Sequence, residues 1–292
     1  MTPDLSTESA DRTSSNQSPN GHSIFSLEDK VAVVTGALGL LGKHHCHALA
    51  EAGANVAVAD LDDKLCKSFA AELEETYRRD AFGITIDITR PASVASSRDK
   101  LIEKFGHVDV LVNNAAINDM FENPRTAAEL SKFENYPLGL WQRSIEVNIT
   151  GTFLCSQIFG TVMAQQGIGS IINIASTYGI VGPDQSIYRK SDGTQEFYKS
   201  PAYPTTKGAV IAFTKFLAAY WGRAGVRVNA ISPGGVRNGQ DEDFIRNYSE
   251  RTPLGRMADP TDYKGVLIFL ASEASRYMTG ANVVVDGGWT AW

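Results

Sequence analysis

Residues 31–42 read VAVVTGALGLLG, a short apolar run that leads directly into three glycines at positions 36, 39 and 42. An unbroken run of Val and Ala is typical of a strand that is buried on both faces. Glycines between a strand and a helix allow a tight turn, the close approach of a pyrophosphate to the backbone, and close packing of the helix on the sheet. The start of the helix adds free N–H groups and the positive end of its dipole. The stretch therefore predicts a strand–turn–helix unit that binds a dinucleotide.

Outward from this unit, short apolar runs alternate with helical patterns along the chain. Strands are expected at Val31–Val34, Asn55–Ala59, Phe82–Ile86, Val108–Val112, Ser170–Ile174, Val226–Ala230 and Asn282–Val285. Helices are expected at Leu41–Ala52, Asp62–Arg78, Pro91–Phe105, Leu140–Gln166, Tyr203–Arg223 and Thr261–Ala271. Short strand–helix–strand connections give right-handed crossovers and a parallel sheet. We predict an α/β fold, a single doubly wound parallel sheet (Rossmann fold) flanked by helices on both faces, formed by residues 25–292 as one domain.

The composition narrows the possible functions. The chain has 27 Lys and Arg against 33 Asp and Glu, a net charge of −6, so it lacks the basic stripe that a nucleic-acid binder needs. Residues 1–24 are polar and have no basic and apolar signal segment, which predicts a disordered tail. Cys46, Cys66 and Cys155 are too scattered for a disulfide framework, and no apolar stretch reaches the ~18 residues of a membrane span. We expect a cytoplasmic protein that acts on a small molecule and not on nucleic acid or a membrane.

Asp60 ends the second expected strand, 24 residues after Gly36. A carboxylate at this place can accept hydrogen bonds from the hydroxyls of an adenosine ribose. It would repel a 2′-phosphate by about 1–4 kcal/mol for charges ~4 Å apart. Neither residues 36–42 nor residues 61–63 contain a Lys or Arg that could bind this phosphate. The sequence therefore favours NAD over NADP, and the alternative role for Asp60 is that of a helix N-cap.

The sequence YPTTK at residues 203–207 places a phenol and an ammonium four residues apart. On a helix these two side chains share one face. Pro204 suits a first helical turn, which would place Tyr203 at the positive end of the helix dipole. A free tyrosine has a pKa near 10, and both the nearby Lys207 and the helix end favour its ionised form. The motif is common by chance, so the motifs around it decide its meaning.

Further polar motifs follow the ends of the expected strands. They are NNAA at 113–116, VNITG at 147–151, NIASTYG at 173–179, SPGG at 232–235 and VDGG at 285–288. Loops that follow parallel strands gather at the carboxyl edge of the sheet, where open α/β folds bind their ligands. In this order the motifs resemble the short-chain dehydrogenase/reductase family, classical type, over about residues 28–288.

The resemblance implies a role for each matching residue. Tyr203 would exchange a proton with the substrate oxygen while hydride moves to or from nicotinamide, and Lys207 would hold the nicotinamide ribose and lower the pKa of Tyr203. Ser176 would hydrogen-bond the substrate oxygen, and Asn148 would hold a relay water. The implied cofactor contacts are Gly36, Leu38, Gly39, Leu40, Leu41 and Gly42 for the pyrophosphate, Asp60, Leu61, Asp87 and Ile88 for the adenosine, and Asn113, Ala115, Tyr203, Lys207, Pro233, Gly234 and Val236 for the remainder.

The chain departs from the family pattern at three places. The classical loop reads TGxxxGxG, whereas here a glycine comes one position early and Leu40 takes the expected glycine site. We expect a slightly altered loop that still binds the nucleotide. Ala116 replaces the usual last glycine of NNAG, a small change. Asn238 stands where a Thr often contacts the carboxamide, which leaves that contact open.

Two long segments flank the expected reaction centre and are candidates for its rim. Ser176 and Tyr203 lie 27 residues apart, and residues 183–201 between them are largely polar with two tyrosines. The segment between Asn118 and Leu140 is also long, with Arg125, Lys132, Glu134 and Tyr136. A polar rim suits a hydroxyl-rich ligand, since buried donors need partners. The pattern is similar to family members linked to bacterial surface-sugar and polyol metabolism. Solvated loops or a subunit contact are the alternative interpretation of both segments.

Other functions stay open from the sequence alone. Arg125, Lys132, Arg189 and Lys190 could hold a phosphopantetheine carrier, which would make the protein a 3-oxoacyl thioester reductase. A non-catalytic nucleotide sensor or scaffold could use the same fold. KHHCH at 43–47 lacks a carboxylate to complete a metal site, so no metal is expected. The expected helices 140–166 and 203–223 correspond to helices that pair subunits in similar proteins, and exposed Trp289 and Trp292 would fit an interface, so we expect a homotetramer or dimer.

Overall fold

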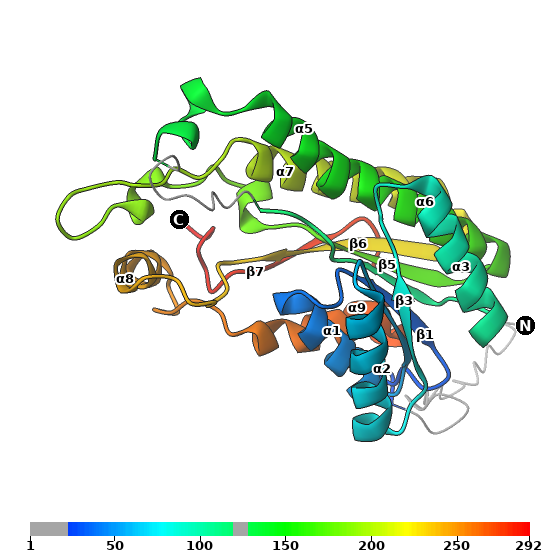
Figure 1. The fold of residues 1–292 in the computed structure, drawn as a ribbon. Helices are drawn as coiled ribbons and strands as arrows, with labels where there is room; N and C mark the ends of the chain where they lie inside the picture. Colours follow the sequence, from blue (N-terminus) through cyan, green and yellow to red (C-terminus); the bar gives the residue numbers. More distant parts are fainter. Residues whose placement is uncertain (1–22, 119–127) are drawn as a thin grey trace, which may run out of the picture.

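The computed structural model describes residues 23–118 and 128–292, which build a seven-stranded sheet with helices on both faces (Figure 1). The strands are β1 (Val31–Thr35), β2 (Asn55–Asp60), β3 (Ala81–Thr85), β4 (Val110–Asn113), β5 (Gly169–Ile174), β6 (Val226–Pro233) and β7 (Asn282–Val285). Their order is β3-β2-β1-β4-β5-β6-β7, and every neighbouring pair is parallel. The chain crosses from one half of the sheet to the other between β3 and β4. The predicted doubly wound parallel sheet is confirmed.

The helices divide between the two faces of this sheet. They are α1 (Leu40–Glu51), α2 (Asp63–Tyr77), α3 (Pro91–Phe105), α5 (Leu138–Ile145), α6 (Thr152–Gln166), α7 (Ala202–Trp221), α8 (Glu242–Arg251) and α9 (Lys264–Ala271). Helices α1, α2 and α9 cover one face and α3, α6 and α7 the other, while α8 stands apart near the C-terminus (Figure 1). Alternate residues of β1 belong to opposite cores, with Val34 in the α1 core and Val33 in the α6 core. All five residues of β1 are buried, as its apolar run predicts.

The largest differences from the predicted elements lie in the helices. The expected helix 140–166 is interrupted by a π-helical turn at Glu146–Gly151, which separates α5 from α6. The expected helix 261–271 begins with a 3₁₀ turn at Pro260–Tyr263. Helix α8 was missed because most of its ten residues are polar and its apolar stripe is short, made of Phe244, Ile245 and Tyr248. Asp241, which accepts a hydrogen bond from the N–H of Phe244 at 2.9 Å, was the available signal for its start.

Among the described residues, the helical stretch Leu138–Gln166 is long and apolar enough to cross a membrane by length and composition. More than half of it is buried inside the fold. Its α6 part packs against α3, β4 and β5, where Phe159 and Met163 are fully buried. The apolar character of this stretch is therefore explained in large part by burial in the protein core.

The two ends of the chain differ from each other. The expected tail lies outside the described residues apart from Ser23 and Ile24, and the carbonyl of Ile24 accepts a hydrogen bond from the N–H of Ala274 at 3.0 Å. At the other end Trp292 is exposed, but the expectation of an exposed Trp289 is wrong. Trp289 is 8% exposed, because its ring stacks on Tyr248 with the ring centroids 4.2 Å apart.

Candidate active site

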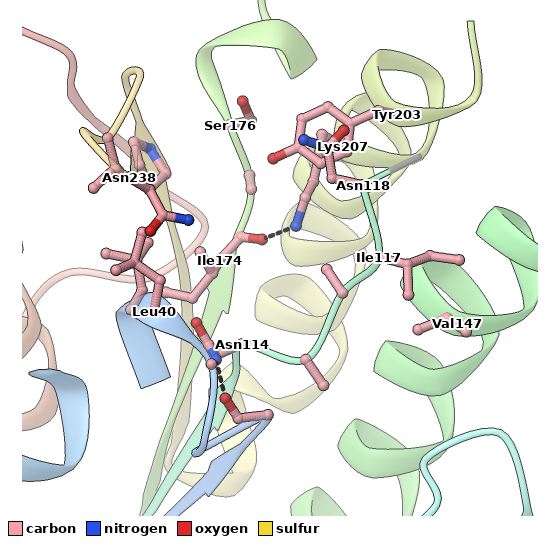
Figure 2. A pocket seen from close by; sticks show the side chains of 18 of the residues that line it. Leu40, Asn114, Ile117, Asn118, Val147, Ile174, Ser176, Tyr203, Lys207 and Asn238 are labelled. Carbon is pink, nitrogen blue, oxygen red and sulfur yellow. Dashed lines mark hydrogen bonds between the residues drawn. The ribbon is translucent and has the colours of Figure 1, made fainter. Parts of the chain in front are cut away.

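A cavity of about 740 Å³ opens at the carboxyl edge of the sheet (Figure 2). Its walls come from the loops that follow β1 to β6 and from the first turns of α7. Pockets of roughly 300–1,000 Å³ hold drug-sized ligands, so the cavity is large enough for an extended cofactor part and a small substrate. The position agrees with the expectation drawn from the strand-end motifs.

The glycine loop after β1 forms one wall of the cavity. Gly36 has a φ of +63°, and a side chain there would lie 2.7 Å from the Cα atom of Ala115. A Cβ atom on Gly42 would lie 2.1 Å from the carbonyl oxygen of Gly36. Gly36 thus permits the turn, whereas Gly42 does not line the cavity and lets α1 pack against the loop. Leu40 and Asn238 lie on the side of the cavity away from Tyr203 (Figure 2).

Asp60 fastens the end of β2 to this loop. One oxygen of its carboxylate accepts a hydrogen bond from the N–H of Leu38 at 2.9 Å, and the other from that of Leu61 at 2.7 Å. All three residues line the cavity. The N-cap of α2 is Asp62, which accepts a hydrogen bond from the N–H of Leu65. The alternative role of Asp60 as a helix N-cap is therefore wrong, and its carboxylate is placed at the cavity.

Asp87 and Ile88 line the same end of the cavity, after β3. A hydrogen bond from the hydroxyl of Thr89 at 2.6 Å is the main cause that lowers the pKa of Asp87. Arg143 of α5 also lines this cavity and was not predicted. Its guanidinium donates to Glu146 at 2.8 Å.

Tyr203 and Ser176 meet in the wall formed by α7 and the end of β5 (Figure 2). Tyr203 is the second residue of α7, as Pro204 in the first turn predicts. Burial raises the pKa of Tyr203, and a hydrogen bond with the Ser176 side chain opposes that rise. The pKa of Tyr203 is therefore raised, whereas the sequence predicted that Lys207 would lower it. The neutral phenol is the favoured resting form.

Lys207 lies one turn further along α7 and points back toward the strand end (Figure 2). Its ammonium donates to the carbonyl oxygen of Ile174 at 2.7 Å and lies 5.7 Å from the ring centroid of Tyr203. The residue is only 4% exposed, and burial lowers its pKa to about 8. A cation held at this depth is poised to interact with polar groups that enter the cavity.

The buried charge of Lys207 should destabilise the folded protein at neutral pH. We expect Lys207→Met to raise the free energy of unfolding of the cofactor-free protein at pH 7 by roughly 1–3 kcal/mol. Below pH 8 folded and unfolded chains both carry the proton, so the penalty is fully present. Between pH 8 and the ordinary lysine pKa of 10.5, Lys207 is protonated only in the unfolded chain, so the parent protein becomes more stable as the pH rises. The difference in unfolding free energy between the Lys207→Met variant and the parent therefore becomes smaller.

Urea unfolding of parent and variant at several pH values between 7 and 10 checks this expectation. Lys215→Met on the exposed side of the same helix is the control and should show no such pH-dependent gain. An advantage of the Lys207→Met variant that grew with pH would contradict the assignment of a buried charge.

Asn148 lies in the π-helical turn and is 1% exposed, so it does not line the cavity. Its side-chain oxygen accepts from the N–H of Ile117 at 2.8 Å, and its amide nitrogen donates to the Ile117 carbonyl at 3.0 Å and to the Thr206 hydroxyl at 3.1 Å. The residue thereby ties the loop after β4 to α7 behind Tyr203. Its role with a relay water stays a prediction.

The prediction that Asn113 contacts the cofactor finds no support in its side chain. Asn113 is 5% exposed and does not line the cavity, because its amide donates to Ser156 at 2.9 Å and to Asn173 at 2.8 Å. Asn114 lines the cavity in its place and donates to the carbonyl oxygens of Thr35 and Gly36. Asn113 is the last residue of β4 and Asn114 the first residue after it, so a difference of one position separates the buried amide from the one at the cavity.

The remaining walls come from both predicted and unpredicted residues. Predicted residues that line the cavity are Gly36, Leu38, Gly39, Leu40, Leu41, Asp60, Leu61, Asp87, Ile88, Ala115, Ser176, Tyr203, Lys207, Pro233, Gly234 and Val236. Sequence reasoning missed Gln240, Phe244, Tyr248 and Met257, which bring α8 and its neighbours to the cavity. Of the two candidate rim segments, residues 183–201 contribute Tyr188 and Lys199, and the other contributes Asn118. Lys132, Glu134 and Tyr136 do not line it, and Arg125 lies outside the described residues.

Comparison with known proteins identifies the relatives of this chain. A family model described as enoyl-(acyl carrier protein) reductase matches residues 36–290. The chain is 36% identical over 265 residues, 91% of each protein, to a 3-alpha-(or 20-beta)-hydroxysteroid dehydrogenase of Mycobacterium tuberculosis. It is 34% identical to a D-threitol dehydrogenase of Mycolicibacterium smegmatis, over 91% of this chain and 95% of that protein.

Solved structures agree with the fold as well. A short-chain type dehydrogenase/reductase from Mycobacterium marinum superposes with a TM-score of 0.79 at 34% identity, over 92% of this chain and 98% of that one. A gluconate 5-dehydrogenase from Burkholderia cenocepacia, solved with NADP and tartrate, gives a TM-score of 0.80 at 28% identity over the same shares.

Proposed function

This chain belongs to the short-chain dehydrogenase/reductase family of nicotinamide-dependent oxidoreductases acting on CH–OH groups. We propose that it uses NAD(H) to interconvert a secondary alcohol and a ketone on a sugar, a polyol or a similar substrate. The observation that carries the proposal is the cavity wall in which Tyr203 meets Ser176, with the buried ammonium of Lys207 one turn away on α7. This combination gives a proton donor, a hydrogen-bond partner for an oxygen, and a nearby positive charge.

The residues of the cavity fit a dinucleotide. The glycine loop leaves no room for side chains at Gly36 and Gly42, and the carboxylate of Asp60 lies at the neighbouring wall. When bound, the nicotinamide ring supplies or accepts the hydride. Gly36 to Leu41 would hold the pyrophosphate, Asp60 the adenosine ribose, and Lys207 the nicotinamide ribose.

The chemistry of the side chains follows from their surroundings. In the direction of reduction, Ser176 donates a hydrogen bond to the carbonyl oxygen and Tyr203 gives it a proton. The phenolate that remains is stabilised by the Ser176 hydroxyl and by the ammonium of Lys207. In the direction of oxidation, the same phenolate takes the proton of the alcohol. Asn148 holds α7 and the loop after β4 in register through Thr206 and Ile117.

A related gluconate 5-dehydrogenase was solved with NADP, so membership of the family does not decide between the two cofactors. The proposal that this chain uses NAD therefore rests on Asp60. We expect Asp60→Ala to narrow the preference for NAD over NADP in kcat/KM by about 10- to 100-fold, because one negative charge beside a 2′-phosphate is removed. Steady-state kinetics with both cofactors measures the ratio. Asp62→Ala is the matched control, since Asp62 caps α2 and does not line the cavity. A parent enzyme that already prefers NADP would contradict this role of Asp60.

The substrate class rests on polar residues that line the cavity near Tyr203, among them Asn118, Tyr178 and Tyr188. Donors of this kind suit a hydroxyl-rich molecule. The experiment is a panel of polyols, sugar acids, ketoses, nucleotide-linked sugars, a hydroxysteroid and a 3-oxoacyl thioester, followed at the NADH absorbance band. Turnover of at least one polyhydroxylated compound is expected. Turnover of the steroid or the thioester alone would contradict the proposed class.

The thioester alternative finds no support in the described part of the rim. Lys132 forms an ion pair with Glu129 at 2.8 Å, and Lys190 forms one with Glu196 at 2.5 Å. Neither lysine lines the cavity, and neither does Arg189.

We further propose a cytoplasmic homo-oligomer, either a dimer or a tetramer. Phe153 of α6 and Phe216 and Tyr220 of α7 are 42%, 60% and 68% exposed. The rings of Phe216 and Tyr220 stack 5.9 Å apart and form an apolar strip on the face where subunits were expected to pair. The three free, buried cysteines favour a reducing compartment.

A further inference from the structure

We propose that Lys199 is the anion-binding residue of the substrate end of the cavity, and that the substrate therefore carries a carboxylate close to its reacting carbon. The inference rests on the proposed function and refines its substrate class from hydroxyl-rich compounds in general to hydroxy acids. It concerns a residue that the family motifs of the sequence do not include.

Lys199 lies directly beside the reacting groups. Its ammonium is 4.4 Å from the ring centroid of Tyr203 and 6.0 Å from that of Tyr178, and it donates to the side-chain oxygen of Asn118. Lys199 and Asn118 both line the cavity. An ammonium in this place can reach a group attached to a carbon whose oxygen is held by Tyr203 and Ser176.

The two lysines on either side of Tyr203 differ in burial and in position relative to α7, which points to different roles. In KSPAYPTTK (residues 199–207) one lysine comes four residues before the tyrosine and the other four residues after it. Lys207 is almost fully buried and bonded to the Ile174 carbonyl. Lys199 is only partly buried, precedes α7 and lines the cavity, so its ammonium is accessible to a molecule bound there.

The long segment before Tyr203 holds the backbone of Lys199 in place. The side chain of Gln185 accepts from the N–H of Lys199 at 2.8 Å and donates to its carbonyl oxygen at 3.1 Å. The amide of Gln195 in turn donates to the carbonyl oxygen of Gln185 at 2.8 Å. Such a two-sided clamp on one residue is more than a solvated loop requires, and it fixes the point from which the ammonium reaches into the cavity.

The clamp is itself anchored to α8. Gln185 begins a 3₁₀ turn at Gln185–Tyr188, whose N-cap Asp184 pairs with Arg251 at 2.7 Å. Arg251 also donates to the hydroxyl of Ser186 at 2.9 Å, and Asn247 donates to the carbonyl of Arg189 at 2.8 Å. Lys199 thus belongs to an arm, residues 183–201, that is held against α8 by these hydrogen bonds and by the ion pair.

The distribution of charge along the cavity agrees with an anionic substrate. Within the described residues, its acidic lining groups are Asp60 and Asp87, which follow β2 and β3 at the adenosine end. The substrate end has Lys199 together with the hydroxyls of Tyr178 and Tyr188, whose oxygens lie 3.5 Å apart. A carboxylate at this end gains an ammonium and hydroxyl donors without meeting a negative group among these lining residues.

A competing role for Lys199 is to act only on Tyr203, because a cation over the face of a phenol ring favours its ionised form. The two roles differ in what they change. An effect through Tyr203 alters kcat and its pH profile for every substrate to the same degree. An anion-binding role alters the affinity for charged substrates and leaves their neutral counterparts almost unaffected.

The test compares pairs of compounds that differ only in a terminal carboxylate or hydroxymethyl group: glycerate and glycerol, threonate and threitol, gluconate and glucitol. Their binding to the enzyme–NADH complex is measured by NADH fluorescence at low ionic strength. We expect the parent to bind the carboxylate member of at least one pair roughly 10- to 100-fold more tightly. Lys199→Met should abolish this difference, and Lys199→Arg should keep most of it.

Lys190→Met is the matched control, because Lys190 lies on the same arm, pairs with Glu196 and does not line the cavity. It should keep the preference of the parent. An unchanged affinity for NADH shows that each variant is folded.

Three results would overturn the proposal. In the first, the parent binds no carboxylate compound detectably, or binds it no more tightly than the neutral partner. In the second, the Lys199→Met variant retains the preference for the carboxylate compound. In the third, Lys199→Met lowers kcat equally for both members of a pair and shifts the pH profile of kcat. The Tyr203→Phe variant separates this proposal from the proposed function. It should keep the binding preference while losing turnover, so normal turnover in that variant would reject the function and leave the binding result standing.

Discussion

Replacing Tyr203 by Phe should lower kcat by about 10²- to 10⁴-fold and leave the affinity for NADH unchanged within about twofold, as expected when a general acid is removed from a preserved site. The change deletes one hydroxyl and its hydrogen bond with Ser176. The ring itself stays, so its packing at the start of α7 and the contact with the Lys199 ammonium at 4.4 Å are retained. The loss therefore falls on proton transfer.

The measurement is steady-state turnover on any substrate that the panel identifies, together with NADH fluorescence titration of both proteins. Tyr220→Phe on the exposed side of the same helix is the control, since it removes the same atom 17 positions away at a site that is 68% exposed. Turnover of Tyr203→Phe equal to that of the parent would remove Tyr203 from the reaction. A parallel loss of NADH binding would assign it to cofactor binding instead.

Replacing Gly42 by Ala should lower the free energy of unfolding by at least about 2 kcal/mol and weaken NADH binding by tenfold or more. The new methyl group would lie 2.1 Å from the Gly36 carbonyl oxygen and 2.8 Å from the Cα atom of Ala37. All of these neighbours are backbone atoms, so no side chain can turn aside to make room. Either α1 moves away from the sheet or the glycine loop changes shape, and the second outcome alters the wall that would hold the pyrophosphate.

Gly139→Ala provides the opposite case within the same protein. Gly139 also lies in the first turn of a helix, but nothing stands within 4 Å of the position that its Cβ atom would take. Ala is a better helix former than Gly, so this variant should be stabilised by up to about 1 kcal/mol. Urea unfolding of the three proteins measures the difference. Equal free energies of unfolding for the Gly42→Ala and Gly139→Ala variants would show that the backbone atoms close to Gly42 do not exclude a methyl group.

The sheet was predictable because burial on both faces leaves an unmistakable pattern. Strand β1 consists of apolar residues ending in Thr35, and the glycines that follow mark the turn into α1. The parallel order follows from strands and helices that alternate with short connections. Helix α8 was not predicted in this way, since only Phe244, Ile245 and Tyr248 of its ten residues are apolar, and so short a stripe is hard to recognise among polar neighbours.

The site was predictable where a motif fixes a side chain and less so where the backbone decides its direction. YPTTK and the serine after β5 lie at the cavity as expected from their positions in the chain, because Pro204 sets the start of α7 and the strand pattern sets the end of β5. Asn113 ends β4 and Asn114 follows it, and only the folded structure shows which of the two side chains faces the cavity. The pKa of Tyr203 also needed the fold, because spacing reveals the nearby Lys207 but not the depth of burial.

The position of Lys199 shows the same limit more clearly. Its distance of four residues from Tyr203 is visible in the sequence, but residue 199 precedes α7, so helical periodicity says nothing about its direction. That direction depends on Gln185, 14 residues earlier, and through it on Arg251 of α8. Contacts between residues so far apart are products of the tertiary fold.

The bracing of residues 183–201 against α8 has a consequence for engineering. The two segments are separate in sequence, but the Asp184–Arg251 ion pair and the hydrogen bonds from Asn247 to the carbonyls of Ile187 and Arg189 join them. They should therefore be exchanged together, as one unit. A chimera that receives only one of them from a related enzyme would break these joints and misplace residue 199. Grafting both together should transplant substrate selectivity onto the unchanged half of the protein that is built for the dinucleotide.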